Sequence, residues 1–190
     1  MRKYLSFFRS RWGSVPLALL AISQSSLAKS IEVDFATLPE DGRPAWSRVG
    51  AGSRQISDST LLLESETEEA AGYIIRGGED DYIWDGEWPL AITFEARAFE
   101  LPDPDLPAAH LVCRGEGWRI QVPIEQEEWL LYQIKIDSEG NPSLQIGQQP
   151  ATPIRMILDS SSARTIAFGD LGRYAEGTSQ WRKLEWSDEL

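Results

Sequence analysis

Cysteine and histidine are almost absent from this chain of 190 residues, which contains one of each. One cysteine excludes an intramolecular disulfide, and zinc sites usually need more Cys and His ligands than this chain has. Any Ser/His/Asp or Cys/His arrangement would depend on His110. His110 and Cys113 are three residues apart, so in a strand they point to opposite faces and do not pair. We therefore expect Cys113 to be a buried structural thiol.

Basic residues are also scarce, with 18 Lys and Arg against 30 Asp and Glu. Four of the basic residues and none of the acidic ones lie in residues 1–28, so the remainder carries a formal charge of −16. Such an acidic chain is a poor partner for nucleic acid or for an anionic membrane surface. Its acidity is typical of a soluble exported protein, and it suits cations or neutral ligands such as glycans.

The sequence lacks an apolar run long enough to span a membrane as a helix. Residues 1–28 instead have a basic start, a short apolar stretch from Val15 to Ile22, and small residues at Ser26 and Ala28. This three-part pattern predicts a secretory signal peptide over 1–28 and a secreted or periplasmic mature chain. The alternatives are an uncleaved membrane anchor or an incorrect start site.

Helical periodicity is absent from the mature chain, which has short alternating apolar segments separated by Gly, Pro and Asp. The clearest segment is 89–100, where Leu90, Ile92, Phe94, Ala96 and Ala98 share one face. The predicted strands are 31–35, 61–66, 72–77, 89–100, 110–115, 117–125, 128–137, 143–147, 165–170 and 179–186. In the last one, Trp181 and Lys183 should share one face, and Leu184 and Trp186 the other. The pattern predicts an all-β antiparallel β-sandwich as one domain over 29–190.

Several segments, in their order, carry a resemblance to a known family. An early segment has Asp34-Phe35, Leu38-Pro39, Trp46 and Gly50, and it is followed by STLLLES, PLAITFEARAF, EEWLLYQIKIDSEGNPSLQIG and IAFGDLGRYAEGTSQWRKLEW. Together they resemble the concanavalin A-like lectin/glucanase jelly-roll superfamily, of the laminin-G-like kind found in exported bacterial proteins. Two departures are Ile146-Gly147 without the usual Asp, and Arg182 after Trp181. The resemblance implies a jelly roll, a fold that hosts lectins, hydrolases and structural domains.

The catalytic patterns typical of hydrolases are missing from the sequence. Glycoside hydrolysis needs two carboxyl groups across the bond, and the glucanase branch supplies them as Glu-x-Asp-x-x-Glu on one strand face, which this chain lacks. The FGD of residues 168–170 is similar to the FGDS block of GDSL-type esterases, but Leu171 stands where the nucleophilic Ser would be. The sequence therefore does not favour an enzyme.

Calcium is the one candidate cofactor. Jelly rolls of the resembled superfamily sometimes hold calcium with Asp carboxylates and backbone carbonyls, since this hard cation takes six to eight oxygens. The candidate ligands are Asp80, Asp81, Asp85 and Asp170. The alternative is that these Asp residues form turns or a solvated loop.

Carbohydrate binding is the leading hypothesis, because the flat C–H faces of sugars pack on aromatic rings. The segment YIWDGEW places aromatic and acidic side chains together, and a second cluster of charged and aromatic side chains surrounds Trp118. The candidate ligand-binding residues are Tyr82, Trp84, Asp85, Glu87, Trp88 and Trp118. The alternative is that these tryptophans brace the fold.

These observations predict an exported, non-catalytic binding domain that recognises carbohydrate or a cell-surface protein. The alternatives are a structural β-sandwich without a small-molecule ligand and a divergent polysaccharide-active enzyme. A sugar binder should show exposed aromatic rings in a groove, whereas an enzyme needs two carboxylates facing each other there. The sequence does not specify the oligomeric state.

Overall fold

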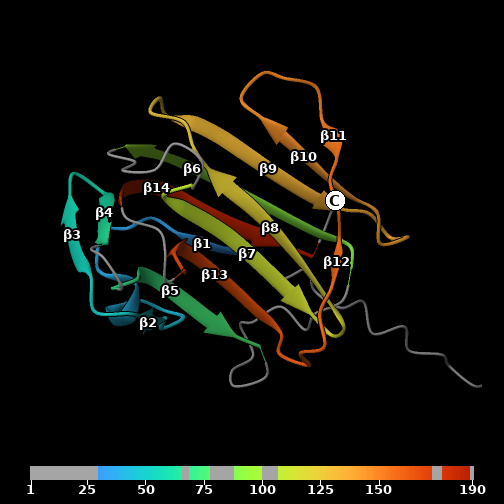
Figure 1. Cartoon of the computed structure of the whole chain (residues 1–190), viewed down its shortest axis with the longest axis horizontal. Coiled ribbons are helices and arrows are strands. Elements are labelled where there is room, and N and C mark those ends of the chain that lie inside the picture. The colour runs from blue at the N-terminus through green and yellow to red at the C-terminus, as the bar shows by residue number, and fades with distance from the viewer. Residues whose placement is uncertain (1–29, 66–68, 78–87, 100–106, 173–176, 189–190) are drawn as a thin grey trace, which may run out of the picture.

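The computed structural model describes residues 30–65, 69–77, 88–99, 107–172 and 177–188. Their strands form two antiparallel sheets (Figure 1). The eight-stranded sheet has the order β11-β10-β9-β6-β14-β4-β3, with β1 pairing β14, and the six-stranded sheet has the order β12-β8-β7-β13-β5-β2. The prediction of an all-β antiparallel sandwich is confirmed. Residues 1–29 lie outside the described part, so the signal peptide stays a prediction.

The eight-stranded sheet contains β1 (Ser30–Val33), β3 (Ser53–Ser57), β4 (Thr60–Ser65), β6 (Leu90–Phe99), β9 (Leu130–Ile136), β10 (Pro142–Ile146), β11 (Thr152–Pro153) and β14 (Gly177–Ser187). The six-stranded sheet contains β2 (Ser47–Val49), β5 (Ala71–Arg76), β7 (Ala109–Gly115), β8 (Trp118–Ile124), β12 (Ile157–Leu158) and β13 (Thr165–Asp170). One short 3-10 helix, η1 (Pro39–Asp41), precedes β2. In the described part of the chain, no helix has the length and apolar character needed to cross a membrane.

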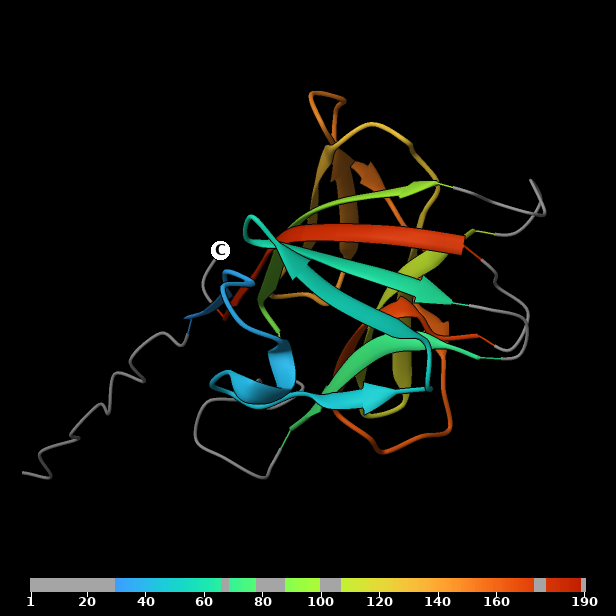
Figure 2. The same cartoon turned by 90° about the vertical axis from the view of Figure 1, so that its left-hand side faces the viewer.

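The core lies between the two sheets, and Figure 2 shows red β14 of one sheet above green β5 of the other. All five apolar residues predicted to share one face of β6 are fully buried in it. Aromatic rings meet at the centre, where the Phe168 ring lies 4.9 Å from that of Trp181 and 5.1 Å from that of Trp46, measured between centroids. Contacts between aromatic rings stabilise the core beyond the gain from burying their apolar surface. This packing fixes which face of each sheet remains outside.

Leu184 and Trp186 share one face of the last strand as predicted, but the prediction that Trp181 shares the other face with Lys183 is wrong. Trp181 pairs with Ala96 of β6 while Lys183 pairs with Glu95, so the register shifts at Arg182. One extra residue in a strand changes the side on which the following residues point. As a result Trp181, Leu184 and Trp186 all enter the core.

Candidate functional site

Most of the predicted ligand-binding and metal-binding residues lie outside the described residues. These are Tyr82, Trp84, Asp85 and Glu87 of the aromatic loop, and Asp80, Asp81 and Asp85 of the calcium hypothesis. Their proposed roles stay predictions. Within the described ranges, no three His, Cys, Asp or Glu residues lie close enough together to hold a metal ion.

The other two predicted aromatic residues, Trp88 and Trp118, lie together. Their ring centroids are 5.9 Å apart. Trp118 begins β8 and is 5% exposed, whereas Trp88 precedes β6 and is 39% exposed. Gly115 leaves room for the Trp118 ring, since a Cβ there would lie 2.4 Å from it. Of this pair, Trp88 has the exposed ring that a sugar could contact, and the buried ring of Trp118 packs against it.

Asp170, at the end of β13, lies on the core side of its sheet opposite Ala71. Its side chain is buried, and its Oδ1 accepts a hydrogen bond from the Gly172 N–H at 2.9 Å. Burial raises the pKa of this carboxyl group, while the Gly172 N–H and the Ser65 hydroxyl oppose that rise. A short-range bond of this kind fixes the turn that follows the strand. The FGD segment therefore forms the end of β13 and the start of the turn that follows it.

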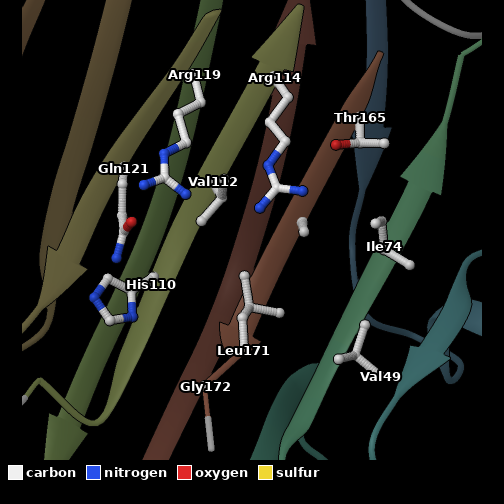
Figure 3. Close-up of a pocket in the computed structure, with 11 residues that line it drawn as sticks. Val49, Ile74, His110, Val112, Arg114, Arg119, Gln121, Thr165, Leu171 and Gly172 are labelled. Atoms are coloured by element: carbon white, nitrogen blue, oxygen red, sulfur yellow. The ribbon is translucent and has the colours of Figure 1, made fainter. Parts of the chain in front are cut away.

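A pocket that sequence reasoning did not find lies on the outer face of the six-stranded sheet (Figure 3). Its volume is about 330 Å³. We call it the outer-sheet pocket, and it is lined by residues of β2, β5, β7, β8 and β13 together with Leu171 and Gly172. Apolar side chains form its middle, namely Val112, Ala167 and Ile74 on three neighbouring strands.

Strand register explains which residues meet in this pocket. Val112 lies opposite Gln121 on one side and Ala167 on the other. Two residues along β7, Arg114 lies between Arg119 and Thr165 in the same way. In the opposite direction along β7, His110 faces the same side, because side chains alternate along a strand. Polar groups therefore flank an apolar floor at both ends.

The polar groups of the pocket are only partly satisfied by the protein. Arg114 Nε lies 3.7 Å from Asp159 Oδ2, too far for a hydrogen bond. The Nε atoms of Arg114 and Arg119 and the Oγ1 of Thr165 are buried without a hydrogen-bond partner. Burial lowers the pKa of His110, which keeps its imidazole neutral near neutral pH. Figure 3 shows both guanidinium groups beside Val112 at one end of the pocket.

The sequence contained part of the signal for this pocket. His110, Val112 and Arg114 alternate with core residues along one predicted strand, and Arg119 and Gln121 do so along the next. The tight connection at Gly115-Glu116-Gly117 sets these two strands opposite each other and could have predicted the Arg114–Arg119 pair. The other pocket residues lie on strands that are far from β7 and β8 in the sequence, so local patterning does not predict that they line the pocket. They are Thr165, Ala167, Ile74 and Val49.

No family model and no curated protein matches this sequence. Solved structures do share its fold. A protein of unknown function from Shewanella oneidensis MR-1 aligns with a TM-score of 0.55 at 11% identity, over 86% of this chain and 87% of that one. A carbohydrate esterase of the Shiga toxin-encoding bacteriophage phi24B gives 0.55 at 13% identity, over 76% and 90%. Peanut lectin gives 0.53 at 9% identity, over 87% and 99%.

These similarities establish the fold. The chain is a β-sandwich of the architecture seen in peanut lectin. Identities this low carry no function from one protein to another, because the same sandwich hosts unrelated activities.

Proposed function

We propose that this chain is an exported, non-catalytic binding domain of the concanavalin A-like class that takes carbohydrate in the outer-sheet pocket. The observation that carries the proposal is the pocket itself. A volume of about 330 Å³ lies within the range typical of small-ligand sites. Sugars present hydroxyl groups around an apolar ring face. The pocket likewise sets Arg114, Arg119, Gln121 and His110 around an apolar floor.

Two further observations support the proposal. The fold is shared with peanut lectin and with a phage protein named as a carbohydrate esterase. The signal-like pattern of residues 1–28 and the acidity of the remainder suit a protein that meets glycans or cell surfaces outside the cytoplasm. Among the described residues, the outer-sheet pocket has no Phe, Tyr or Trp in its lining, so the Trp88–Trp118 pair is a separate, aromatic surface that the same experiment tests.

A glycan array followed by calorimetry on the purified full chain tests the proposal. Ala167→Phe would fill the pocket floor, because Ala167 points into the pocket from β13. Its matched control is Ala91→Phe, the same change on the outer face of the eight-stranded sheet. Ala91 lies opposite Lys135 there, far from the pocket residues in the strand order.

We expect at least one glycan to bind, with affinity about tenfold weaker or worse in Ala167→Phe and nearly unchanged in Ala91→Phe. Melting temperatures of both variants show whether each is folded. Absence of glycan binding by the wild type would refute the proposal. Binding that Ala167→Phe leaves intact but Trp88→Ala abolishes would move the site to the tryptophan pair and refute the pocket. Release of sugar products during the assay would favour the enzyme alternative.

A further inference from the structure

The outer-sheet pocket contains two like charges set directly opposite each other. Arg114 of β7 and Arg119 of β8 are cross-strand partners and project to the same face (Figure 3). Directly opposed like charges destabilise a strand pair. Arg76 of β5 extends the same row beyond Thr165. This row of cations occurs in a chain whose overall charge is −12, so the local sign is opposite to that of the protein.

The protein compensates this charge only weakly. Among the described residues, Asp159 is the one whose carboxylate lies within 4.0 Å of Arg114, at 3.7 Å. In the described part of the chain, Arg119 has no carboxylate within 4.0 Å. The Nε atom of each arginine is buried without an acceptor. Leaving a buried donor unpaired is costly, and an arginine cannot discard its proton to avoid that cost.

Thr165 is a second, independent sign that the pocket is arranged for an external group. The residue is 4% exposed, and its Oγ1 has no partner. Figure 3 shows this oxygen turned toward Arg114, its neighbour across the β7–β13 register. The hydroxyl and the two guanidinium groups converge at one end of the apolar floor. An oxygen-rich anion there would satisfy donors that the protein leaves free.

We infer that the ligand is an acidic saccharide whose anionic group, a carboxylate or a sulfate ester, binds between Arg114 and Arg119. This inference rests on the proposed carbohydrate function and adds the charge of the ligand. A carboxylate and a sulfate ester each present a pair of anionic oxygens that a guanidinium group can bind with two parallel hydrogen bonds. Gln121 and the neutral His110 provide uncharged hydrogen-bonding groups for sugar hydroxyls further along the pocket. The acidic remainder of the surface would then disfavour non-specific binding of polyanions.

Calorimetry on the full chain tests the inference with four probes. They are a uronate oligosaccharide, a sulfated oligosaccharide, a neutral oligosaccharide of equal length and inorganic sulfate. Each probe is titrated into the wild type and into Arg114→Gln, Arg119→Gln and Lys135→Gln. Lys135 is an exposed cation on the eight-stranded sheet, so its variant makes the same change in net charge away from the pocket.

We expect an acidic oligosaccharide to bind at least about tenfold more tightly than the neutral one. Each arginine variant should lose about tenfold or more of that affinity, while Lys135→Gln stays within about twofold. Added salt should weaken wild-type binding, because a charge pair near the surface is screened. Without ligand, Arg119→Gln should melt no lower than the wild type, since it removes one of two opposed charges. This melting temperature separates a ligand-binding role of Arg119 from a structural role, because loss of a structural side chain would lower it.

The remaining outcomes separate the two proposals. Equal binding of neutral and acidic saccharides, unchanged in both arginine variants, would overturn the inference and leave the carbohydrate function standing. Binding of inorganic sulfate without any saccharide, lost in both arginine variants, would support the anion site and overturn the carbohydrate function. Absence of binding by the wild type to all four probes would overturn the inference, and the carbohydrate function would fall as well only if the glycan array also showed no binding.

Discussion

The ring of Trp88 lies with its centroid 5.9 Å from that of Trp118, at an interplanar angle of 47°. This contact joins the segment before β6 of one sheet to the start of β8 of the other. Trp118 is buried and Trp88 is partly exposed, so the pair spans the boundary between core and solvent. The same two residues were predicted to bind sugar, and the contact gives at least one of them a structural role.

Replacing Trp88 with Ala should therefore lower the free energy of unfolding as well as any affinity that depends on this ring. We expect a loss of about 1–2 kcal/mol, less than the ~3–5 kcal/mol typical of a fully buried aromatic residue, because 39% of Trp88 is exposed. Chemical denaturation measures the change, and Lys135→Ala, at an exposed position, should stay within about 0.5 kcal/mol of wild type. An unchanged free energy of unfolding would mean that the contact of Trp88 with Trp118 does not stabilise the fold.

The position of Trp118 depends on the absence of a side chain at Gly115. A Cβ at Gly115 would lie 2.4 Å from the Trp118 ring, closer than any real contact, so Gly115→Ala must displace the ring. Overpacking of this kind costs about 1–3 kcal/mol. Gly42→Ala is the matched control, because its nearest non-neighbouring atom is 3.5 Å away and its φ of −83° suits alanine. Equal melting temperatures for the two variants would contradict the role assigned to Gly115.

The sequence predicted the inner strands and missed the outer ones. The four strands that it missed, β2, β3, β11 and β12, are the edge strands that end the two sheets. An edge strand is covered on fewer sides, so it needs less apolar alternation, and Ser-Arg-Gln-Ile-Ser of β3 shows little. The inner strand β6 is buried along one face and alternates over its whole length.

Neither the bulge in β14 nor the outer-sheet pocket could be predicted from the sequence, and the physical reasons differ. The bulge adds Arg182 between two residues that a regular strand would place on one face, and period-two reasoning has no means to detect it. The pocket joins His110, Ala167 and Ile74 from three strands whose register is set by packing of the whole core. Local patterning determines which residues face outward, and only the folded sheet determines which of them meet.

Cys113 should be unreactive in the folded protein. It is fully buried on the core face of β7, and burial raises the pKa of its thiol, which suppresses the reactive thiolate. We expect an aromatic disulfide reagent to label the native protein only as fast as the core opens, and to label it at once in denaturant. Destabilisation by Gly115→Ala should accelerate labelling. Rapid labelling of the native wild type would contradict the burial of this thiol.

Asp170 should give a characteristic dependence of stability on pH. Burial raises its pKa in the folded state above the usual value for Asp, so the folded protein holds this proton more tightly than the unfolded chain does. The contribution of Asp170 to stability is then fully present below about pH 4 and is lost as the pH rises through the raised pKa. The melting temperature of wild type minus that of Asp170→Asn should fall over this window and level off above it.

Asp137 provides a control of opposite sign in the same experiment. Hydrogen bonds from Asn141 and from the backbone N–H of Glu139 lower the pKa of Asp137. Its contribution is present above the usual Asp pKa and is lost as the pH falls through the lowered one. The difference between wild type and Asp137→Asn should therefore rise with pH below about pH 4 and stay level over the window in which the Asp170 difference falls. Parallel curves for the two variants would show that Asp170 is not held in a low-dielectric site, and the turn after β13 would then have to admit water.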